Sequence, residues 1–280
     1  MVDDQQMNQL QATARELRRD LVQMMGADKP HHFGGSLSSI ELVTALYFYK
    51  MRYDPADPEW EARDRFVMSK GHSVPAQYAA LGRLGVIPAE QLPTLKRLGS
   101  ILQGHPNACM TPGIEACTGS LGQGLSFANG IAMAARIRKL GCRVYVLLGD
   151  GELQEGQVWE AAMGAATQKL DTLVALIDRN GLKSQGMVDE AKSLEPLGEK
   201  WKSFGWHVMT VDGHDLRQIC QALDEAETVK GRPSVIIAHT VKGKGVSFME
   251  GRFEFHNAPI SGERWREAMQ ELALGKEAVQ

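Results

Sequence analysis

Long hydrophobic runs are missing from this 280-residue sequence, and neither sign of charge dominates it. The longest apolar runs, such as VYVLL and LVALI, are about five residues, whereas a helix needs about 20 to cross a bilayer. The 31 Lys and Arg residues are balanced by 34 Asp and Glu, with no basic cluster to attract nucleic acid or an anionic membrane surface. We therefore expect a soluble protein that binds no nucleic acid and no membrane, and has small polar ligands.

Cysteine is also scarce. The four cysteines lie far apart and form no close pair, so neither a zinc cluster nor a disulfide framework is indicated; they are Cys109, Cys117, Cys142 and Cys220. The N-terminus is polar and acidic, unlike a secretory signal peptide. Free thiols suit a reducing compartment, and we expect the protein to be cytoplasmic.

The first part of the chain has the pattern of helices. Apolar residues recur at helical spacing from Leu10 to Met24 and stop at Gly26, which is typical of a helix with a glycine end. Residues 38–50 and 73–85 predict two further helices, the first with serines at its start. We expect this part to be mostly helical.

From residue 120 onward, helical and strand patterns alternate. The predicted order is helix 120–140, strand 143–148, helix 156–170, strand 172–177, helix 197–204, strand 207–211, helix 215–229 and strand 234–240. Such alternation favours parallel strands joined by right-handed helical crossovers. No linker or internal repeat interrupts it. We therefore predict an α/β fold, a three-layer α/β/α arrangement around a mostly parallel sheet, in a single domain covering residues 1–280.

An acidic, glycine-rich motif follows the strand at 143–148. Gly149 and Gly151 would let the backbone approach a phosphate, but Asp150 between them would repel it unless a cation lay in between. Asn180, thirty residues later, follows the next strand, with the carbonyl of Leu182 just beyond. Ligands of parallel sheets gather at the carboxyl ends of the strands. The motif thus suggests a magnesium or calcium site, although a bare GDG can also be a tight strand-to-helix turn.

These motifs resemble those of a known family. GDG followed by Asn about thirty residues later is similar to the thiamine diphosphate fingerprint. Four further segments occur in the order typical of transketolases: HHFGGSLSSIELVTALYF, SKGHSVPAQYAAL, GHPNACMTPGIEACTGSLGQGLSFANGIA and GRFEFHNAP. The resemblance runs from about residue 10 to 260. The segment GDGELQEGQVWEAA is closer to transketolases than to the α subunits of 2-oxo acid dehydrogenases or to deoxyxylulose-phosphate synthase.

The resemblance implies catalytic roles for three histidines and one glutamate. His105 would bind the hydroxyl of the transferred two-carbon fragment, while His32 and His256 would assist proton transfer at the donor hydroxyl. Glu155 would join a proton relay between two cofactors near a dimer axis; its position at a helix start could equally reflect the helix dipole. We expect ordinary structural roles for the histidines outside the motifs, which are His207, His214 and His239.

The resemblance also implies a cofactor and a metal. Thiamine diphosphate would be bound by the residues that match the family motifs, namely His72, Gly119, Ser120, Leu121, Gly149, Asp150, Gly151, Glu152, Asn180 and His256. The divalent metal, Mg²⁺ or else Ca²⁺ or Mn²⁺, would be held by Asp150, Asn180 and the carbonyl of Leu182. The segment around 118–124 could alternatively be a plain helix start after a glycine turn. We expect the Glu152 side chain itself to be solvated.

Three details of the loops depart from the family pattern or allow two interpretations. Ser120 stands where many relatives have proline, and Arg179 stands where another residue type is usual. Lys242 and Lys244 resemble a family segment, but two lysines among glycines are also typical of a mobile basic loop.

Full-length transketolases carry a pyrimidine-binding domain and a C-terminal domain after the region that matches here. Residues 261–280 instead predict one terminal amphipathic helix, with no candidate for the glutamate that activates the aminopyrimidine. We therefore expect the diphosphate-binding subunit of a split transketolase, acting on sugars or sugar phosphates with a C-terminal transketolase subunit, in an α2β2 assembly. The alternatives are a thiamine diphosphate-binding regulatory protein, a nucleotide-binding α/β module, or a carboligase subunit similar to deoxyxylulose-phosphate synthase.

Overall fold

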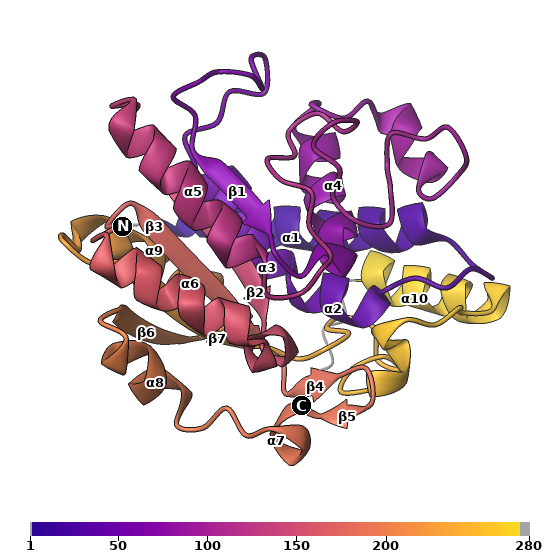
Figure 1. The fold of residues 1–280 in the computed structure, drawn as a ribbon. Coiled ribbons are helices and arrows are strands. Elements are labelled where there is room, and N and C mark those ends of the chain that lie inside the picture. The colour runs from indigo at the N-terminus through magenta and orange to yellow at the C-terminus, as the bar shows by residue number, and fades with distance from the viewer. Residues whose placement is uncertain (1, 275–280) are drawn as a thin grey trace.

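The computed structural model describes residues 2–274, and its centre is a five-stranded parallel sheet (Figure 1). The strands lie in the order β1, β2, β3, β7, β6, with bounds Arg65–Met68, Val144–Gly149, Leu173–Arg179, Ser234–His239 and His207–Asp212. Every neighbouring pair in this sheet is parallel. A separate antiparallel pair follows β3: β4 is Leu182–Lys183 and β5 is Gly186–Met187. The predicted α/β fold with a mostly parallel sheet is confirmed.

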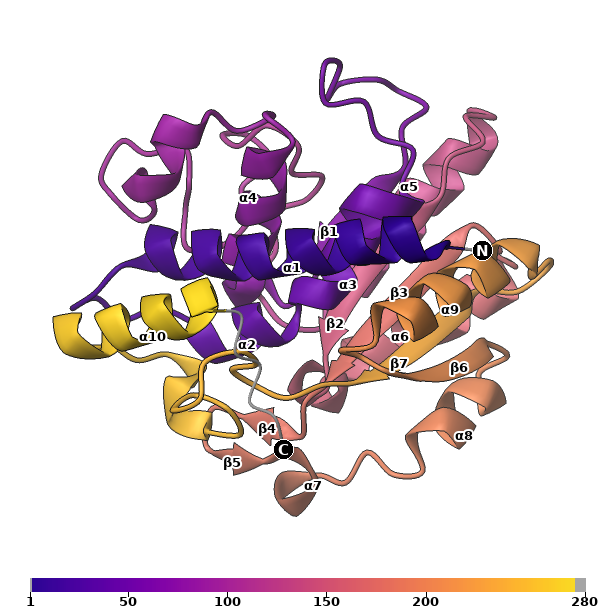
Figure 2. The ribbon, with the colours of Figure 1, turned by 180° about the vertical axis from the view of Figure 1, so that it is seen from behind.

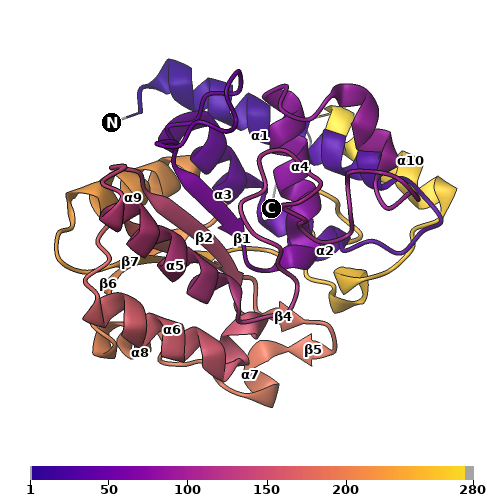
Figure 3. The same ribbon diagram turned by 45° about the horizontal axis from the view of Figure 1, so that its top comes forward.

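Helices cover both faces of this sheet. One layer, in front of the sheet in Figure 1, contains α5 (Gly124–Ile137), α6 (Gly156–Thr167) and α8 (Leu197–Ser203). The other layer, in front in Figure 2, contains α1 (Asp4–Met25), α3 (Ile40–Ala45) and α9 (Leu216–Thr228). Figure 3 shows the sheet between the two layers. The remaining α-helices are α2 (Phe33–Ser38), α4 (Val74–Arg83), α7 (Val188–Ala191) and α10 (Gly262–Leu274), and short 3₁₀ or π-helical segments span Leu46–Lys50, Gly71–Ser73, Ala89–Thr94, Gly151–Gln154 and Phe253–His256.

The central strands are apolar over most of their length because both faces are covered. Successive residues of a strand point to opposite faces, so Val146 and Leu148 of β2 pack in the core beneath α5 and α6. Tyr145 and Leu147 pack in the other core, beneath α1, α3 and α9. Buried parallel strands have this near-continuous apolar pattern, which is why the strand predictions from residue 143 onward agree with the structure.

Helix ends follow the capping residues that the sequence supplies. The Asp3 side chain accepts a hydrogen bond of 2.7 Å from the amide of Gln6 at the start of α1, and Gly26, with φ 66°, ends the helix. Helix α5 begins at Gly124 rather than at residue 120, because Gly119 and Gly122 adopt positive φ and form a turn before it.

The N-terminal part differs from the prediction in two respects. Strand β1 was missed because it is only four residues long and lies within a polar stretch. The helix predicted at 38–50 is observed as α3 and a π-helical turn at 46–50, and Ser39 separates α3 from α2, which precedes it. The predicted terminal helix corresponds to α10; its last part, residues 275–280, lies outside the described residues.

The parallel register brings three loops to one edge of the sheet. Gly149 pairs with Asp178, and Arg179 pairs with His239, so the loops after β2, β3 and β7 begin at the same level.

Within residues 2–274, none of the helices has the length and apolar character to cross a membrane.

Candidate active site

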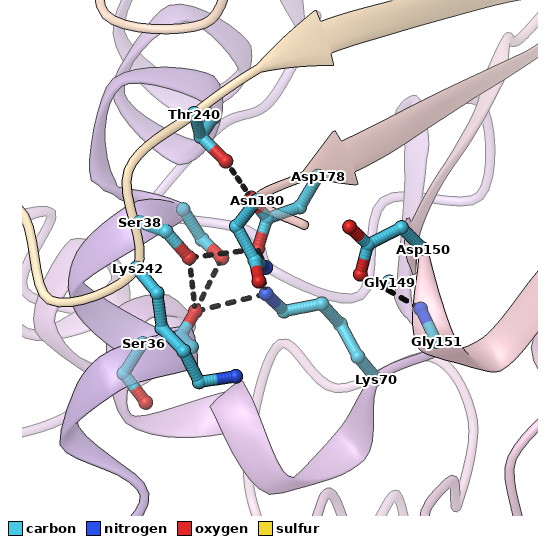
Figure 4. Close-up of polar contacts among 12 residues, drawn as sticks. Ser36, Ser38, Lys70, Gly149, Asp150, Gly151, Asp178, Asn180, Thr240 and Lys242 are labelled. Atoms are coloured by element: carbon cyan, nitrogen blue, oxygen red, sulfur yellow. Dashed lines mark hydrogen bonds and ion pairs between the residues drawn. The ribbon is translucent and has the colours of Figure 1, made fainter. Parts of the chain in front are cut away.

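Asp150 and Asn180, the side chains predicted to bind a metal, lie at the ends of neighbouring strands (Figure 4). Asp150 is buried, and its Oδ1 accepts a hydrogen bond of 2.7 Å from the Gly151 amide. Burial raises the pKa of Asp150, and the nearby Asp178 raises it further. Oδ1 of Asn180 accepts a 3.1 Å hydrogen bond from the amide of Leu182. A cation bound beside Asp150 would therefore stabilise the charged form of this carboxylate.

The third predicted metal ligand, the carbonyl of Leu182, already has one hydrogen-bond partner and keeps one lone pair. It accepts a hydrogen bond of 3.0 Å from Nζ of Lys242, which also lies 3.3 Å from Nδ1 of His256. Lys242 is buried, and desolvation with the neighbouring Lys70 lowers its pKa to about 8. The sequence allows two interpretations of Lys242, as part of a family segment or of a mobile basic loop. In the structure Lys242 lines the cavity beside Asp150 and Asn180.

Lys70 and Asp178 form a buried ion pair beneath these loops (Figure 4). Asp178 also accepts hydrogen bonds from Ser38 at 2.7 Å and from Thr240. Burial alone would raise the pKa of Asp178, but the Lys70 ammonium and the hydrogen bonds from Lys70, Thr240 and Ser38 together outweigh burial and hold the pKa below its usual range. Lys70 donates a second hydrogen bond, of 2.9 Å, to the carbonyl of Gly35. The pair thus joins three segments: α2, the turn after β1 and the end of β3.

The cavity between these side chains has a volume of about 190 Å³. Its lining includes Lys70, His72, Asp150, Asn180 and Lys242. Complete small-molecule sites have volumes of about 300–1,000 Å³, so this cavity has the size of part of a site. Hard oxygen donors suit Mg²⁺ or Ca²⁺, and two lysines suit a diphosphate, so the residues present fit the metal–diphosphate end of a thiamine cofactor.

The four histidines singled out from the sequence come together around His32. Ring centroids of His72, His256 and His105 lie 5.0, 5.4 and 6.2 Å from that of His32, and those of His72 and His256 are 5.0 Å apart. They come from four separate segments, which only the folded chain brings together. His207 and His214 pair elsewhere with Glu225 and Glu41, and His239 ends β7 with an exposed side chain.

Burial keeps the clustered histidines neutral. Desolvation, with help from neighbouring histidines and Lys96, lowers the pKa of His32 to about 3. Desolvation and Lys242 lower the pKa of His256 to about 4. Desolvation, which is only partial at the exposed His105, also lowers the pKa values of His72 and His105, followed by the effect of a lysine, Lys70 and Lys96 respectively. Neutral imidazoles can accept or donate a hydrogen bond at a substrate hydroxyl.

The loop that carries Gly119 is packed tightly against His105. A Cβ at Gly119, where φ is 140°, would lie 2.7 Å from Cδ2 of His105, so only glycine fits without a shift. A Cβ at Gly71 would lie 2.8 Å from the Gly119 amide nitrogen. Ser120 and Leu121 next to it are exposed, with Leu121 36% accessible. Of these two predicted cofactor-binding residues, Leu121 also lines the 190 Å³ cavity.

The expectation that the Glu152 side chain is solvated is wrong. Glu152 is 2% exposed and accepts hydrogen bonds from Ser69 Oγ and from the amides of Gly122, at 2.9 Å, and Gly149, at 3.1 Å. Burial raises its pKa, against these hydrogen bonds. The 3₁₀ turn Gly151–Gln154 bends the chain back and turns this side chain inward. Glu152 therefore ties three loops of the site together.

Glu155 lies at the surface, just beyond this turn. It occupies the N-cap position of α6, one residue before the helix starts, and makes no side-chain capping hydrogen bond. Its Cβ packs near Gly122, where an added Cβ would come within 2.9 Å. It is therefore separate from the 190 Å³ cavity, and its role as a relay stays a prediction.

The parallel sheet and the lysines, carboxylate and neutral histidines at its carboxyl edge define a diphosphate-binding enzyme domain. Residues 6–278 match the family described as transketolase, thiamine diphosphate binding domain. The chain belongs to the transketolase family. The relatives of similar length agree with the expected diphosphate-binding subunit of a split transketolase.

Two of these relatives have nearly the same length as this chain. It is 46% identical over 263 residues to a 6-deoxy-6-sulfo-D-fructose transketolase subunit of Clostridium sp. (strain MSTE9), covering 94% of this chain and 96% of the relative. It is 44% identical over 268 residues to one of the subunits of the apulose-4-phosphate transketolase of Phocaeicola vulgatus, covering 96% and 95%.

Full-length transketolases are also similar, but the chain spans less than half of each. It is 37% identical to the human transketolase over 273 residues, covering 96% of this chain and 43% of the human one. The solved structure of the transketolase from Leishmania mexicana superposes with a TM-score of 0.88 at 31% identity, covering 94% of this chain and 41% of that one. This chain thus corresponds to the thiamine diphosphate-binding part of a transketolase.

Proposed function

We propose that this chain transfers a two-carbon ketol unit from a ketose or ketose phosphate to an aldose or aldose phosphate, as one subunit of a split transketolase. The observation that carries the proposal is the edge of the sheet where Asp150, Asn180 and Lys242 adjoin four clustered histidines. The match to subunits of about the same length supports a second chain as a requirement for activity.

Thiamine diphosphate is the proposed cofactor, and Mg²⁺ is the proposed metal, with Ca²⁺ or Mn²⁺ as substitutes. Asp150, Asn180 and the Leu182 carbonyl would hold the metal; that carbonyl oxygen keeps one lone pair beside the hydrogen bond that it accepts from Lys242. Lys70 and Lys242 would neutralise the diphosphate, and His72, held neutral, would donate a hydrogen bond to it. When bound, thiamine diphosphate supplies the carbon nucleophile and the electron sink needed to break a carbon–carbon bond beside a carbonyl.

The histidines would manage protons and orient hydroxyl groups. His32 and His256, neutral at pH 7, can accept the proton of the donor hydroxyl as its carbon–carbon bond breaks and return it to the acceptor oxygen. His105 is more exposed, beside Gly119, and would bind the hydroxyl of the retained two-carbon fragment. The same two histidines can serve both halves of the reaction, because cleavage of the donor releases a hydroxyl proton and addition to the acceptor takes one up.

The second chain would carry the pyrimidine-binding and C-terminal domains. The surface formed by α5, α6 and the loop before α5 exposes large apolar side chains, namely Leu121 at 36%, Phe127 at 46%, Met163 at 49% and Ile137 at 77%. Such a surface is typical of a protein–protein interface. We propose an α2β2 assembly, in which Glu155 on the same surface joins the relay between two cofactors. The cytoplasm, where sugar phosphates are metabolised, is the proposed location.

The test is an assay of ketol transfer with thiamine diphosphate, Mg²⁺ and a panel of ketose donors, run on the chain with and without its partner subunit. Phosphorylated and sulfonated donors belong in the panel, because the two relatives of similar length are named for a sulfo-sugar and a sugar phosphate. Cofactor binding without transfer to any acceptor, in the presence of the partner, would instead support a regulatory role.

A further inference from the structure

Arg179 is a buried arginine at the end of β3 that contacts three carboxylates. Its side chain is 8% exposed. Nη1 lies 3.3 Å from Oδ2 of Asp150, and Nη2 lies 2.6 Å from Oδ2 of Asp189 and 3.2 Å from Oε1 of Glu195. The planar guanidinium, with five donors in a fixed geometry, can hold several carboxylates at once.

The contact with Asp150 fixes which of its two oxygens is available to a cation. Oδ2 accepts two hydrogen bonds, one from Arg179 and one of 2.6 Å from the amide of Gly181. Among residues 2–274, Oδ1 accepts a hydrogen bond only from the Gly151 amide. A carboxylate oxygen has about two lone pairs, so Oδ1 keeps acceptor capacity while Oδ2 is saturated. Arg179 therefore sets the rotation of the carboxyl group.

The other two contacts tie the segment 186–197 to the same guanidinium. Asp189 also accepts a hydrogen bond of 3.1 Å from the Leu194 amide, and Glu195 accepts one of 2.9 Å from the Leu197 amide. Few side chains of this segment are buried, the apolar ones being Val188, Leu194 and Leu197. With so small an apolar anchor, polar contacts decide how firmly the segment is held.

We propose that Arg179 is a positioning residue for the metal-binding carboxylate, and that through it metal and diphosphate binding is coupled to the order of residues 186–197. This inference rests on the proposed function, because it requires the metal site at Asp150. Two effects of the arginine oppose each other. Its positive charge repels a nearby cation. Its planar guanidinium, however, orients Asp150 by hydrogen bonding and offsets the repulsion among three carboxylates. We infer that orientation outweighs repulsion, since Arg179 is held on the Oδ2 side and leaves Oδ1 accessible.

The experiment measures Mn²⁺ binding to the full chain at saturating thiamine diphosphate, by electron paramagnetic resonance. The variants are Arg179→Met, which has a similar length but no charge, and Arg179→Lys, which keeps the charge but lacks the planar guanidinium group. Arg63→Met is the matched control: Arg63 is 7% exposed and paired with Glu115, just before the amino end of β1, at the opposite edge of the sheet. Hydrogen exchange of residues 186–197 is followed with and without Mn²⁺ and thiamine diphosphate.

We expect Arg179→Met to weaken Mn²⁺ binding at least tenfold, Arg179→Lys to fall between it and the wild type, and Arg63→Met to bind Mn²⁺ as the wild type does. Ligands should slow exchange in 186–197 in the wild type and in Arg63→Met, and not in Arg179→Met. Equal or tighter Mn²⁺ binding by Arg179→Met would overturn the positioning role and leave the metal site standing. Failure of the wild type to bind Mn²⁺ with thiamine diphosphate would overturn both this inference and the proposed metal site.

Discussion

The Lys70 ammonium donates a hydrogen bond to the Asp178 carboxylate in the interior, where the turn after β1 meets the end of β3. Each side chain is at most 2% exposed. Two charges removed from water in this way are stable only as a pair with further hydrogen bonds, and Ser38, Thr240 and Gly35 supply these. The pair therefore stabilises the fold beneath the site, where it joins α2, the turn after β1 and the end of β3.

Removing one partner should leave an uncompensated buried charge. We expect Lys70→Met to lower the free energy of unfolding of the cofactor-free chain by about 3–5 kcal/mol. Urea unfolding followed by tryptophan fluorescence measures it. The double variant Lys70→Met/Asp178→Leu should be less destabilised than the sum of the two single variants, because it leaves no lone charge. Strict additivity would mean that the two side chains do not depend on each other.

Metal-dependent cofactor binding should depend on Asp150 and Asn180. We expect Asp150→Ala and Asn180→Ala to weaken thiamine diphosphate binding in the presence of Mg²⁺ by at least tenfold, since each removes one oxygen ligand of the proposed metal. Titration calorimetry with the assembled enzyme measures the affinity. Ser184→Ala, also at the cavity wall, is the control and should bind almost normally. Unchanged affinity in both ligand variants would remove the metal-site interpretation.

His105 should matter for transfer and not for cofactor affinity. The side chain is exposed beside Gly119, outside the cavity that adjoins Asp150, so His105→Ala should bind thiamine diphosphate as the wild type does. The loss of a group that binds the reacting fragment should lower kcat by roughly 10²-fold. Steady-state kinetics at saturating cofactor decide the matter. A wild-type kcat would return His105 to the role of a structural histidine.

The sequence predicted β2, β3 and β7 because buried parallel strands are apolar on both faces, and it predicted the clustered histidines through motifs. It did not predict the two-residue strands β4 and β5. Local patterns could not reveal the rest. Strand β1 is too short to show a period, and the inward turn of Glu152 depends on Ser69 and Gly122, which are far away in the chain. Arg179 was visible only as an unusual residue, because its partners Asp189 and Glu195 reach it only in the folded chain.

Acid should destabilise the chain through its neutral histidines. In the folded state the pKa values of His32 and His256 are about 3 and about 4, whereas an unfolded histidine has a pKa of about 6.5. Below about pH 6.5 the unfolded chain therefore binds protons that the folded chain does not, and stability is lost as the pH falls toward 4. The stabilisation by these neutral rings is complete above pH 6.5 or so.

The measurement is the Tm of the cofactor-free chain at pH 7.5 and pH 5.5. We expect a lower Tm at pH 5.5 in the wild type and a smaller decrease in His32→Asn, which has no proton to gain at this position. His239→Asn changes an exposed histidine at the end of β7 and should show the full decrease of the wild type. An equal decrease in His32→Asn and the wild type would contradict the assignment of His32 as a ring held neutral by burial.

The most direct test of the split-enzyme account compares the purified chain alone with the chain plus its partner subunit. Both are assayed for ketol transfer with thiamine diphosphate, Mg²⁺ and the panel of ketose donors. The exposed apolar side chains Leu121 and Phe127 lie on the surface that we propose as the interface with the partner subunit. We predict no transfer by the chain alone and clear turnover once the partner is added. Robust turnover by the single chain would contradict the account.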